Sequence, residues 1–172
     1  IAAVALQRAG AGGVQPLSPS LHEAALRSID LVYHEDFEGA LEKGRAMIRE
    51  APDHPAGYFF CGAALDSWMV HYRSAAKEDE FYRYCNDAVE KAEEQLDRGT
   101  EDPWVTFFMG GAEGLKGNYE MRYERWITAF RYGWKAMAIL RELGEEHEQM
   151  YDVAYGIGTY IYWRSAMSKV LK

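Results

Sequence analysis

The residue types that most often bind metals or act as nucleophiles are sparse in this chain of 172 residues. Its histidines are widely separated, and they form neither a His-Glu-x-x-His pair nor a Cys-x-x-Cys-His sequence. One histidine, His147, lies among the acidic residues Glu145, Glu146 and Glu148. Such acids at a helix start usually stabilise the helix dipole, and the spacing of zinc ligands is missing. We therefore expect no metal site and no cofactor.

Cys61 and Cys85 lie on neighbouring predicted helices, 24 residues apart. In an exported protein such a pair can form a disulfide bond. The alternative is two buried thiols, because free cysteine behaves as a small apolar core residue. We favour the buried thiols, and the sequence shows no cysteine–histidine nucleophile.

Two glycine clusters, Gly110-Gly111 and Gly156-Ile157-Gly158, raise the question of a phosphate-binding loop. No predicted strand precedes them and no Gly-Lys-Ser/Thr follows, so the context of a nucleotide site is absent. Because no catalytic constellation remains, the sequence predicts that the protein is not an enzyme.

Composition limits the class of protein further. Hydrophobic residues make up 48% of the chain and aromatic residues 14%, which is enough for a core and excludes a disordered chain. The net charge of −8, without a basic block, argues against a nucleic-acid partner. Two cysteines are too few for a disulfide scaffold. No apolar run reaches the ~18 residues of a transmembrane segment.

The elements that would position a site are all predicted to be helices, because apolar residues recur at helical spacing and strand alternation is absent. Residues 1–19, rich in Gly and Pro, predict a flexible linker, and residues 20–172 predict one helical domain. Ser20 and Glu23 fit a capping box at the first helix. The predicted helices span about 20–33, 36–50, 55–74, 79–98, 103–116, 119–143 and 146–170.

Two of the predicted boundaries depend on glycine. Lys116-Gly117-Asn118 predicts a tight turn, and Gly144 predicts a helix end.

An internal repeat is visible when the sequence is shifted by 48 residues. Prolines, aromatic residues and small residues then return in one register. We expect the repeated glycines to lie where helix backbones approach closely, so that leucine there would disrupt the stack. The aligned positions include Pro55 with Pro103, Phe59-Phe60 with Phe107-Phe108, and Gly62 with Gly110 and Gly158.

Three segments around these positions, 36–41, 51–55 and 58–65, carry a family resemblance. Asp36-Phe37-Glu38-Gly39-Ala40-Leu41, Ala51-Pro52-Asp53-His54-Pro55 and Tyr58-Phe59-Phe60-Cys61-Gly62-Ala63-Ala64-Leu65 resemble the second helix, the linking turn and the first helix of a tetratricopeptide repeat. The resemblance extends over about residues 20–165. It implies an all-α, right-handed superhelical stack of antiparallel helix pairs with about seven helices.

The repeat length departs from that family. The small residues Ser28 and Gly62 are separated by 34 residues, but the next two steps are 48 residues each. The family period is about 34 residues. The additional 14 residues correspond to about four helical turns, so lengthened helices still present nearly the same face.

In the resembled family, the first helix of each repeat lines a groove. On this chain that implies groove residues with an aromatic or small side chain and some acid, which argues against capture of a terminal carboxylate. An apolar peptide or helix fits this lining better. The implied groove residues are Phe59, Ala63, Asp66, Trp104, Phe107, Gly111, Asp152, Tyr155, Thr159 and Tyr162.

Aromatic residues also gather in the lengthened helices. Trp126, Phe130 and Trp134 recur every four residues on one predicted face, with Tyr123 just before them. Aromatic residues are enriched at interface cores, so we expect a protein contact here. Full burial of Tyr123 and Trp134 within the monomer would contradict this expectation.

The predicted function is a non-catalytic scaffold that binds a partner protein or peptide through an aromatic-lined helical surface. One alternative is a permanent accessory subunit of a larger assembly, and another is a helical protein that binds a small molecule between its helices. The start at Ile1 and the small residues that follow favour an exported or periplasmic protein over a cytoplasmic one.

Overall fold

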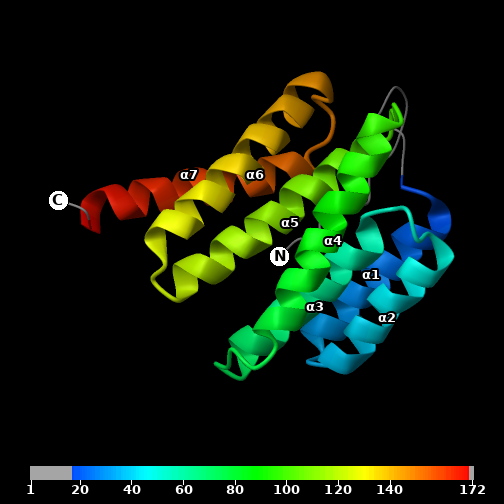
Figure 1. The fold of residues 1–172 in the computed structure, drawn as a ribbon, viewed down its shortest axis with the longest axis horizontal. Coiled ribbons are helices and arrows are strands. Elements are labelled where there is room, and N and C mark those ends of the chain that lie inside the picture. The colour runs from blue at the N-terminus through cyan, green and yellow to red at the C-terminus, as the bar shows by residue number, and fades with distance from the viewer. Residues whose placement is uncertain (1–16, 171–172) are drawn as a thin grey trace.

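The computed structural model describes residues 17–170, with side chains to residue 165. This part of the chain forms seven α-helices and contains no strand, so the predicted all-α fold is confirmed (Figure 1). The helices are α1 (Pro19–Tyr33), α2 (Phe37–Glu50), α3 (Ala56–His71), α4 (Glu78–Asp97), α5 (Pro103–Arg122), α6 (Trp126–Glu146) and α7 (Asp152–Val170).

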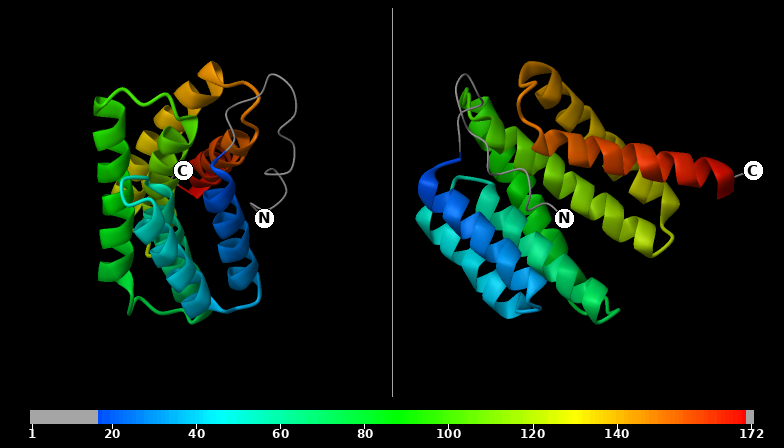
Figure 2. Two further views of the ribbon diagram at one scale, coloured as in Figure 1. Left: turned by 90° about the vertical axis from the view of Figure 1, so that its right-hand side faces the viewer. Right: turned by 180° about the vertical axis from the view of Figure 1, so that it is seen from behind.

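Consecutive helices pack against each other as antiparallel neighbours (Figures 1 and 2). The odd-numbered helices also touch in series: α1 packs on α3, α3 on α5, and α5 on α7. Helices α3 and α5 are therefore at the centre of the molecule. The C-terminal end of α7 extends beyond the other helices (Figure 1).

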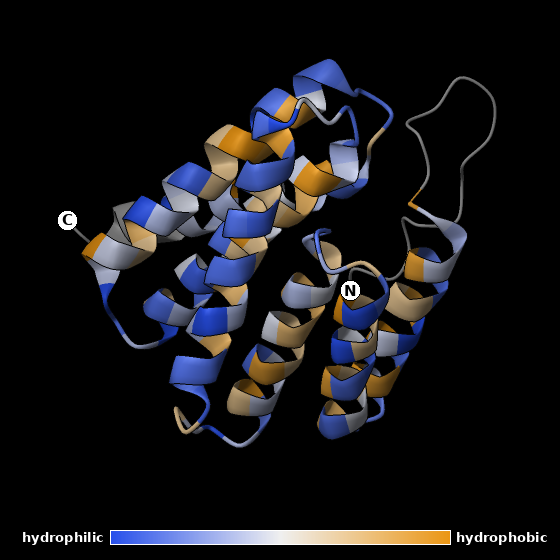
Figure 3. Ribbon diagram, turned by 45° about the vertical axis from the view of Figure 1, so that its right-hand side comes forward, coloured by the Kyte–Doolittle hydropathy of each residue, from blue (hydrophilic) through white to orange (hydrophobic). Residues whose placement is uncertain are grey.

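The buried apolar residues form two clusters that share α3 and α5. One cluster joins these helices to α2 and α4 and contains the fully buried Phe81 and Tyr119. The other joins them to α1, α6 and α7 and contains Phe60, Phe108 and Leu140. Apolar residues lie mainly on helix sides that face other helices, and the outer sides are mostly polar (Figure 3). The core thus consists of two layers on either side of α3 and α5.

Cys61 and Cys85 lie in the first of these clusters as free, buried thiols, which confirms the favoured prediction. Burial raises the pKa of Cys61 to about 12 and also raises the pKa of Cys85. Both residues therefore act as small core residues.

Helix starts follow the expected capping chemistry, with one correction. The Asp102 carboxylate accepts the N–H of Trp104 at 2.9 Å, and Pro103 occupies the first turn of α5. The predicted cap at Ser20 is wrong, because Ser18 caps α1 and accepts the N–H of Leu21 at 3.4 Å. Helical structure thus begins within the predicted linker, whose residues 1–16 lie outside the described part.

The predicted turn at Lys116-Gly117-Asn118 is also wrong, because α5 continues to Arg122. A Cβ atom on Gly117 would lie 3.2 Å from the backbone nitrogen of Gly133, so this glycine allows α5 and α6 to approach. Gly144 does not end α6 either, because that helix continues to Glu146. A glycine can lie at a turn or at a close contact between two helices, and the sequence alone did not show which of the two applies here.

Helices α1, α3 and α5 end in the same way. Each is followed by a non-glycine residue in the left-handed region: Glu35 (φ 61°), Arg73 (φ 49°) and Glu124 (φ 58°). The next residue then donates its N–H to a carbonyl five residues earlier, as in a Schellman motif. This repeated turn was not visible in the sequence because none of the three positions is glycine.

The repeated glycines agree with the expected close approach at two of three positions. A Cβ atom would lie 2.9 Å from the Cys85 Sγ at Gly62, and 2.8 Å from the Leu140 side chain at Gly110. A Cβ atom on Gly158 would meet no described side chain or neighbouring helix within 4 Å, so that prediction is wrong. In α7 the close contact with Leu140 is made by Gly156 instead.

Candidate binding groove

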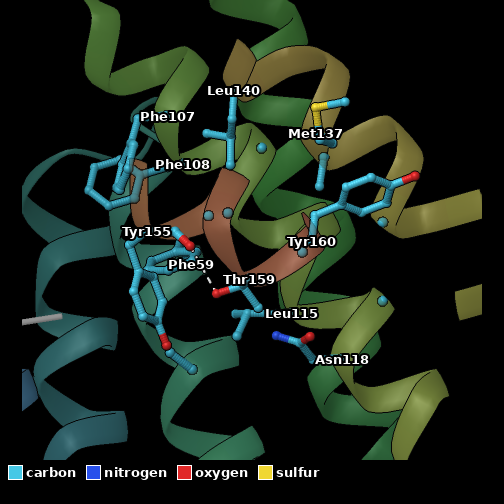
Figure 4. Close-up of a pocket in the computed structure, with 18 of the residues that line it drawn as sticks. Phe59, Phe107, Phe108, Leu115, Asn118, Met137, Leu140, Tyr155, Thr159 and Tyr160 are labelled. Carbon is cyan, nitrogen blue, oxygen red and sulfur yellow. Dashed lines mark hydrogen bonds between the residues drawn. The ribbon is translucent and has the colours of Figure 1, made fainter. Parts of the chain in front are cut away.

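A groove of about 1050 Å³ runs between α1, α3, α5, α6 and α7 (Figure 4). Aromatic side chains, aliphatic side chains and glycines form most of its lining, and the charged residues among them are Asp152, Arg131 and Arg164. Ligand pockets usually measure about 300–1000 Å³. The groove therefore has room for more than a compact small molecule.

One wall of the groove is a cluster of aromatic rings from α3 and α5. The ring of Phe59 lies 5.3 Å from that of Phe60 and 5.2 Å from that of Phe108, measured between centroids. The rings of Trp104 and Phe107 are 5.4 Å apart in an edge-to-face arrangement. Such contacts hold the rings in place, so this wall is formed before any ligand binds.

The floor of the groove is formed by glycines on α5. Gly110, Gly111, Gly114 and Gly117 all line it. A Cβ atom on Gly111 would lie 2.8 Å from the Phe59 ring, whereas one on Gly114 would have only the Cβ of Ala136 nearby, at 3.9 Å. Of these four glycines, Gly114 is the one with open space beside it, so a side chain added there would extend into the groove.

Exposed apolar residues of α6 form the open end. Trp126, Ile127 and Phe130 line the groove and are 40%, 82% and 57% exposed. Large apolar residues gathered on a surface usually mark a binding site.

Polar groups in the groove are few and come from several helices. Asn118 from α5 and Thr159 from α7 are both at the site, and the Thr159 hydroxyl donates to the Tyr155 carbonyl at 2.9 Å (Figure 4). The Tyr160 hydroxyl is buried and has no hydrogen-bond partner among the described residues. Burial raises the pKa of Asp152. Isolated polar groups of this kind can orient a bound ligand.

Ten of the fourteen residues proposed for binding from the sequence line the groove. Trp126, Phe130 and Tyr155 are exposed, whereas Trp104 is buried and Phe59 is half-buried. The ten are Phe59, Ala63, Trp104, Phe107, Gly111, Trp126, Phe130, Asp152, Tyr155 and Thr159.

The other four predicted residues lie outside the groove. Asp66 is half-buried and forms an ion pair with Arg122, and burial raises its pKa. Tyr123, Trp134 and Tyr162 are 40%, 55% and 64% exposed. Tyr123 and Trp134 are thus not buried within the monomer. The expectation that they form a protein contact is therefore not contradicted.

A second, polar cavity of about 530 Å³ lies between α4, α5 and α6. It was not predicted from the sequence. Glu113 and Lys116 of α5 are almost fully buried there, and the Lys116 Nζ lies 3.2 Å from Glu113 and 3.1 Å from the Asn86 side chain. The Nζ of Lys135 lies 2.8 Å from Glu113. This hydrogen bond raises the pKa of Lys135. Glu113 is therefore the shared counter-ion of Lys116 and Lys135, and Lys135 also lies 3.9 Å from Glu93.

A related cluster surrounds Glu120, one helical turn further along α5. Glu120 accepts a hydrogen bond from Tyr82 and pairs with Arg125. Arg125 also pairs with Glu78 at 2.9 Å. Burial, followed by the Glu120 contact, raises the pKa of Tyr82. The spacing of Glu113, Lys116 and Glu120 on one helical face was the available signal, but the predicted turn at 116–118 interrupted it.

Within residues 17–170 no group of three or more His, Cys, Asp or Glu side chains is placed to hold a metal ion. His147 and its acidic neighbours accordingly form no such group. In the same range no helix is both long and apolar enough to cross a membrane.

No protein-family model, no curated protein and no solved structure matches the chain.

Proposed function

We propose that this protein is a non-catalytic binding protein that holds an apolar helical segment of a partner protein in the groove. The observation that carries the proposal is the groove itself, which is lined by aromatic rings and glycines and has almost no charge. Amphipathic helices bind by placing their apolar face in a hydrophobic groove. The resemblance to tetratricopeptide repeats, which bind partners along the same series of helices, supports the same function.

The size of the groove favours a helix as the occupant. A helix about 10 Å wide and three turns long occupies roughly 1300 Å³. The groove of about 1050 Å³ can therefore accommodate most of such a helix while leaving one side exposed. The glycine floor would allow the partner backbone to come close to α5.

A permanent contact with a second protein is the alternative that a specific observation favours. Tyr123, Trp134 and Tyr162 are exposed outside the groove. Exposed aromatic residues on several helices are typical of a subunit that stays in an assembly. Such a subunit would be isolated as a stable complex, whereas a groove that binds helical segments would exchange them.

The proposal is tested by selecting helical peptides against the purified protein. A displayed library of 18-residue peptides with fixed helix-favouring positions is panned against the wild-type protein and against Gly114→Leu. The introduced leucine side chain would enter the groove from a position where only the Ala136 Cβ lies nearby. We expect enriched peptides to bind the wild-type protein and to lose at least about tenfold in affinity for Gly114→Leu.

Gly158→Leu is the matched control, because a Cβ atom on Gly158 would meet no described neighbour within 4 Å and Gly158 does not line the groove. It should bind the peptides as the wild type does. Failure to enrich any peptide, or equal binding by Gly114→Leu, would contradict the proposed function.

A further inference from the structure

The charges that line the groove are separated along its length. Asp152 begins α7 and Arg164 follows it by 12 residues on the same helix. At 1.5 Å per residue the two positions are about 18 Å apart. One end of the groove is therefore acidic and the other basic, with an uncharged lining between them.

Arg131 of α6 lies at the basic end of the groove and also borders the polar cavity between α4, α5 and α6. A Cβ atom on Gly133 would lie 3.3 Å from the Tyr160 ring, which fixes the register of α6 against α7. Arg131 precedes Gly133 by two residues, and Arg164 follows Tyr160 by four. Because α6 and α7 run antiparallel, both arginines lie on the same side of the Gly133–Tyr160 contact, towards the C-terminal end of α7.

Both of these arginines are exposed, and the described part of the chain supplies an ion pair to neither of them. By contrast, Arg122 and Arg125, on either side of the turn between α5 and α6, are both paired. Arg131 and Arg164 are therefore available to contact a negative charge on a bound partner.

We infer that the groove binds an amphipathic helix of a partner protein with its acidic N-terminal turn against Arg131 and Arg164 and its basic C-terminal turn against Asp152. This inference rests on the proposed function and adds the charge and direction of the bound segment. Charge complementarity at both ends decides which end of the helix lies where. The apolar rings between them bind the middle of the helix.

The direction follows from the relative size of two effects. Acids in the first turn and bases in the last turn stabilise a helix, because they oppose its dipole. The dipole alone would favour the opposite direction in this groove, but a helix end carries only about half a unit charge. Full side-chain charges therefore outweigh it. The bound helix would run antiparallel to α7, with its charged turns about three turns apart.

The test uses a peptide from the selection described above and a twin in which the charged residues of its two ends are exchanged. Binding of both labelled peptides to the purified protein is measured by fluorescence anisotropy at low and high ionic strength. We expect the acidic-first peptide to bind about five- to tenfold more tightly, which corresponds to two or three partly exposed charge contacts. The difference should shrink at high salt.

The variant Arg131→Glu/Arg164→Glu separates a groove effect from the intrinsic helix preference of the peptide. It should reverse or abolish the preference. Because Arg131 also borders the polar cavity, thermal denaturation checks that the double variant is folded, and Arg164→Glu alone, at a position that lines only the groove, should weaken the preference as well. Arg141→Glu, at a position outside the groove, is the matched control and should leave the preference unchanged.

The outcomes distinguish the two proposals. If selected peptides bind but their twins bind equally well, or if the double variant keeps the preference, the inferred orientation is wrong and the groove function remains. If no peptide is enriched, the proposed function fails and this inference fails with it.

Discussion

The two sides of α5 differ in the kind of residue that they bury. Towards the groove, α5 presents glycines and aromatic rings, and the exposed apolar residues of α6 continue that surface. Towards α4 and α6 it presents Glu113, Lys116 and Glu120, all nearly fully buried. On the polar side every one of these charges has an oppositely charged neighbour.

This difference separates a side that stabilises the fold from a side that can bind a ligand. A buried charge that has its partner is already satisfied, and removing the partner is costly. An apolar surface in contact with water gains free energy when something covers it. Substitutions on the polar side should therefore act on stability, and substitutions at the groove rim should act on binding.

The largest expected effect is on the polar side. Glu113→Leu removes the carboxylate that contacts both Lys116 and Lys135. Because Lys116 would stay buried without its counter-ion, we expect a loss of about 3 kcal/mol in the free energy of unfolding. Urea denaturation followed by circular dichroism measures it.

The double variant Glu113→Leu/Lys116→Met supplies the control for that prediction. It removes both buried charges, so it should recover most of the lost stability. Glu93→Leu, at an exposed carboxylate 3.9 Å from Lys135, should change stability by less than about 0.5 kcal/mol. If Glu113→Leu is as stable as Glu93→Leu, the polar side does not stabilise the fold as described.

The opposite behaviour is expected at the groove rim. Trp126→Ala/Phe130→Ala removes two exposed rings that line the groove. The free energy of unfolding should change by less than about 1 kcal/mol, whereas affinity for the selected helical peptides should fall by about tenfold or more. Thermal denaturation and fluorescence anisotropy measure the two quantities. A loss of stability with unchanged affinity would reverse the assignment of the two sides.

Two glycines on the groove side of α5 provide a smaller and matched test. Gly117 lies against the Gly133 backbone, and Gly114 has only Ala136 nearby. Gly117→Ala should destabilise the protein by about 1–2 kcal/mol through overpacking. Gly114→Ala should stabilise it by about 0.5–1 kcal/mol, because alanine favours the helix. Urea denaturation of both variants under the same conditions gives their free energies of unfolding. Equal changes in the two variants would show that α5 and α6 do not approach closely at Gly117.

The smallest predicted effect is at the turn that ends α5. Glu124 adopts a φ of 58°, a conformation that glycine reaches without strain. Glu124→Gly should therefore raise the free energy of unfolding by about 0.5–1 kcal/mol, and Glu124→Ala should not. Thermal denaturation of both variants gives the answer, and a gain with alanine would exclude the backbone explanation.

Local patterns predicted most of the helices but not how glycines are used. The apolar spacing and the prolines predicted seven helices close to their observed positions. Gly117 and Gly144 were expected to end helices and instead lie within them, against Gly133 and Val153. A glycine that ends a helix and one that admits a neighbouring helix have the same local sequence signal, because the neighbour belongs to a distant part of the chain.

The candidate site, like the helices, was predicted only in part. The family resemblance implied that Phe59, Phe107 and Tyr155 line one groove, and all three residues do so. Asp66 was placed there too, but its ion pair with Arg122 lies outside the groove. The buried charges of α5 were missed because a lysine or glutamate is ordinarily expected on the surface.

The helical character of this protein could be read from the order of its residues, because helical periodicity and capping are properties of neighbouring residues. The same is true of its acidic charge and its high aromatic content. The folded arrangement of the helices was needed to learn which aromatic residues line a groove, which glycines form its floor, and which charges are buried and paired. These properties depend on contacts between residues far apart in the chain, and the packing of five helices brings those residues together around α5.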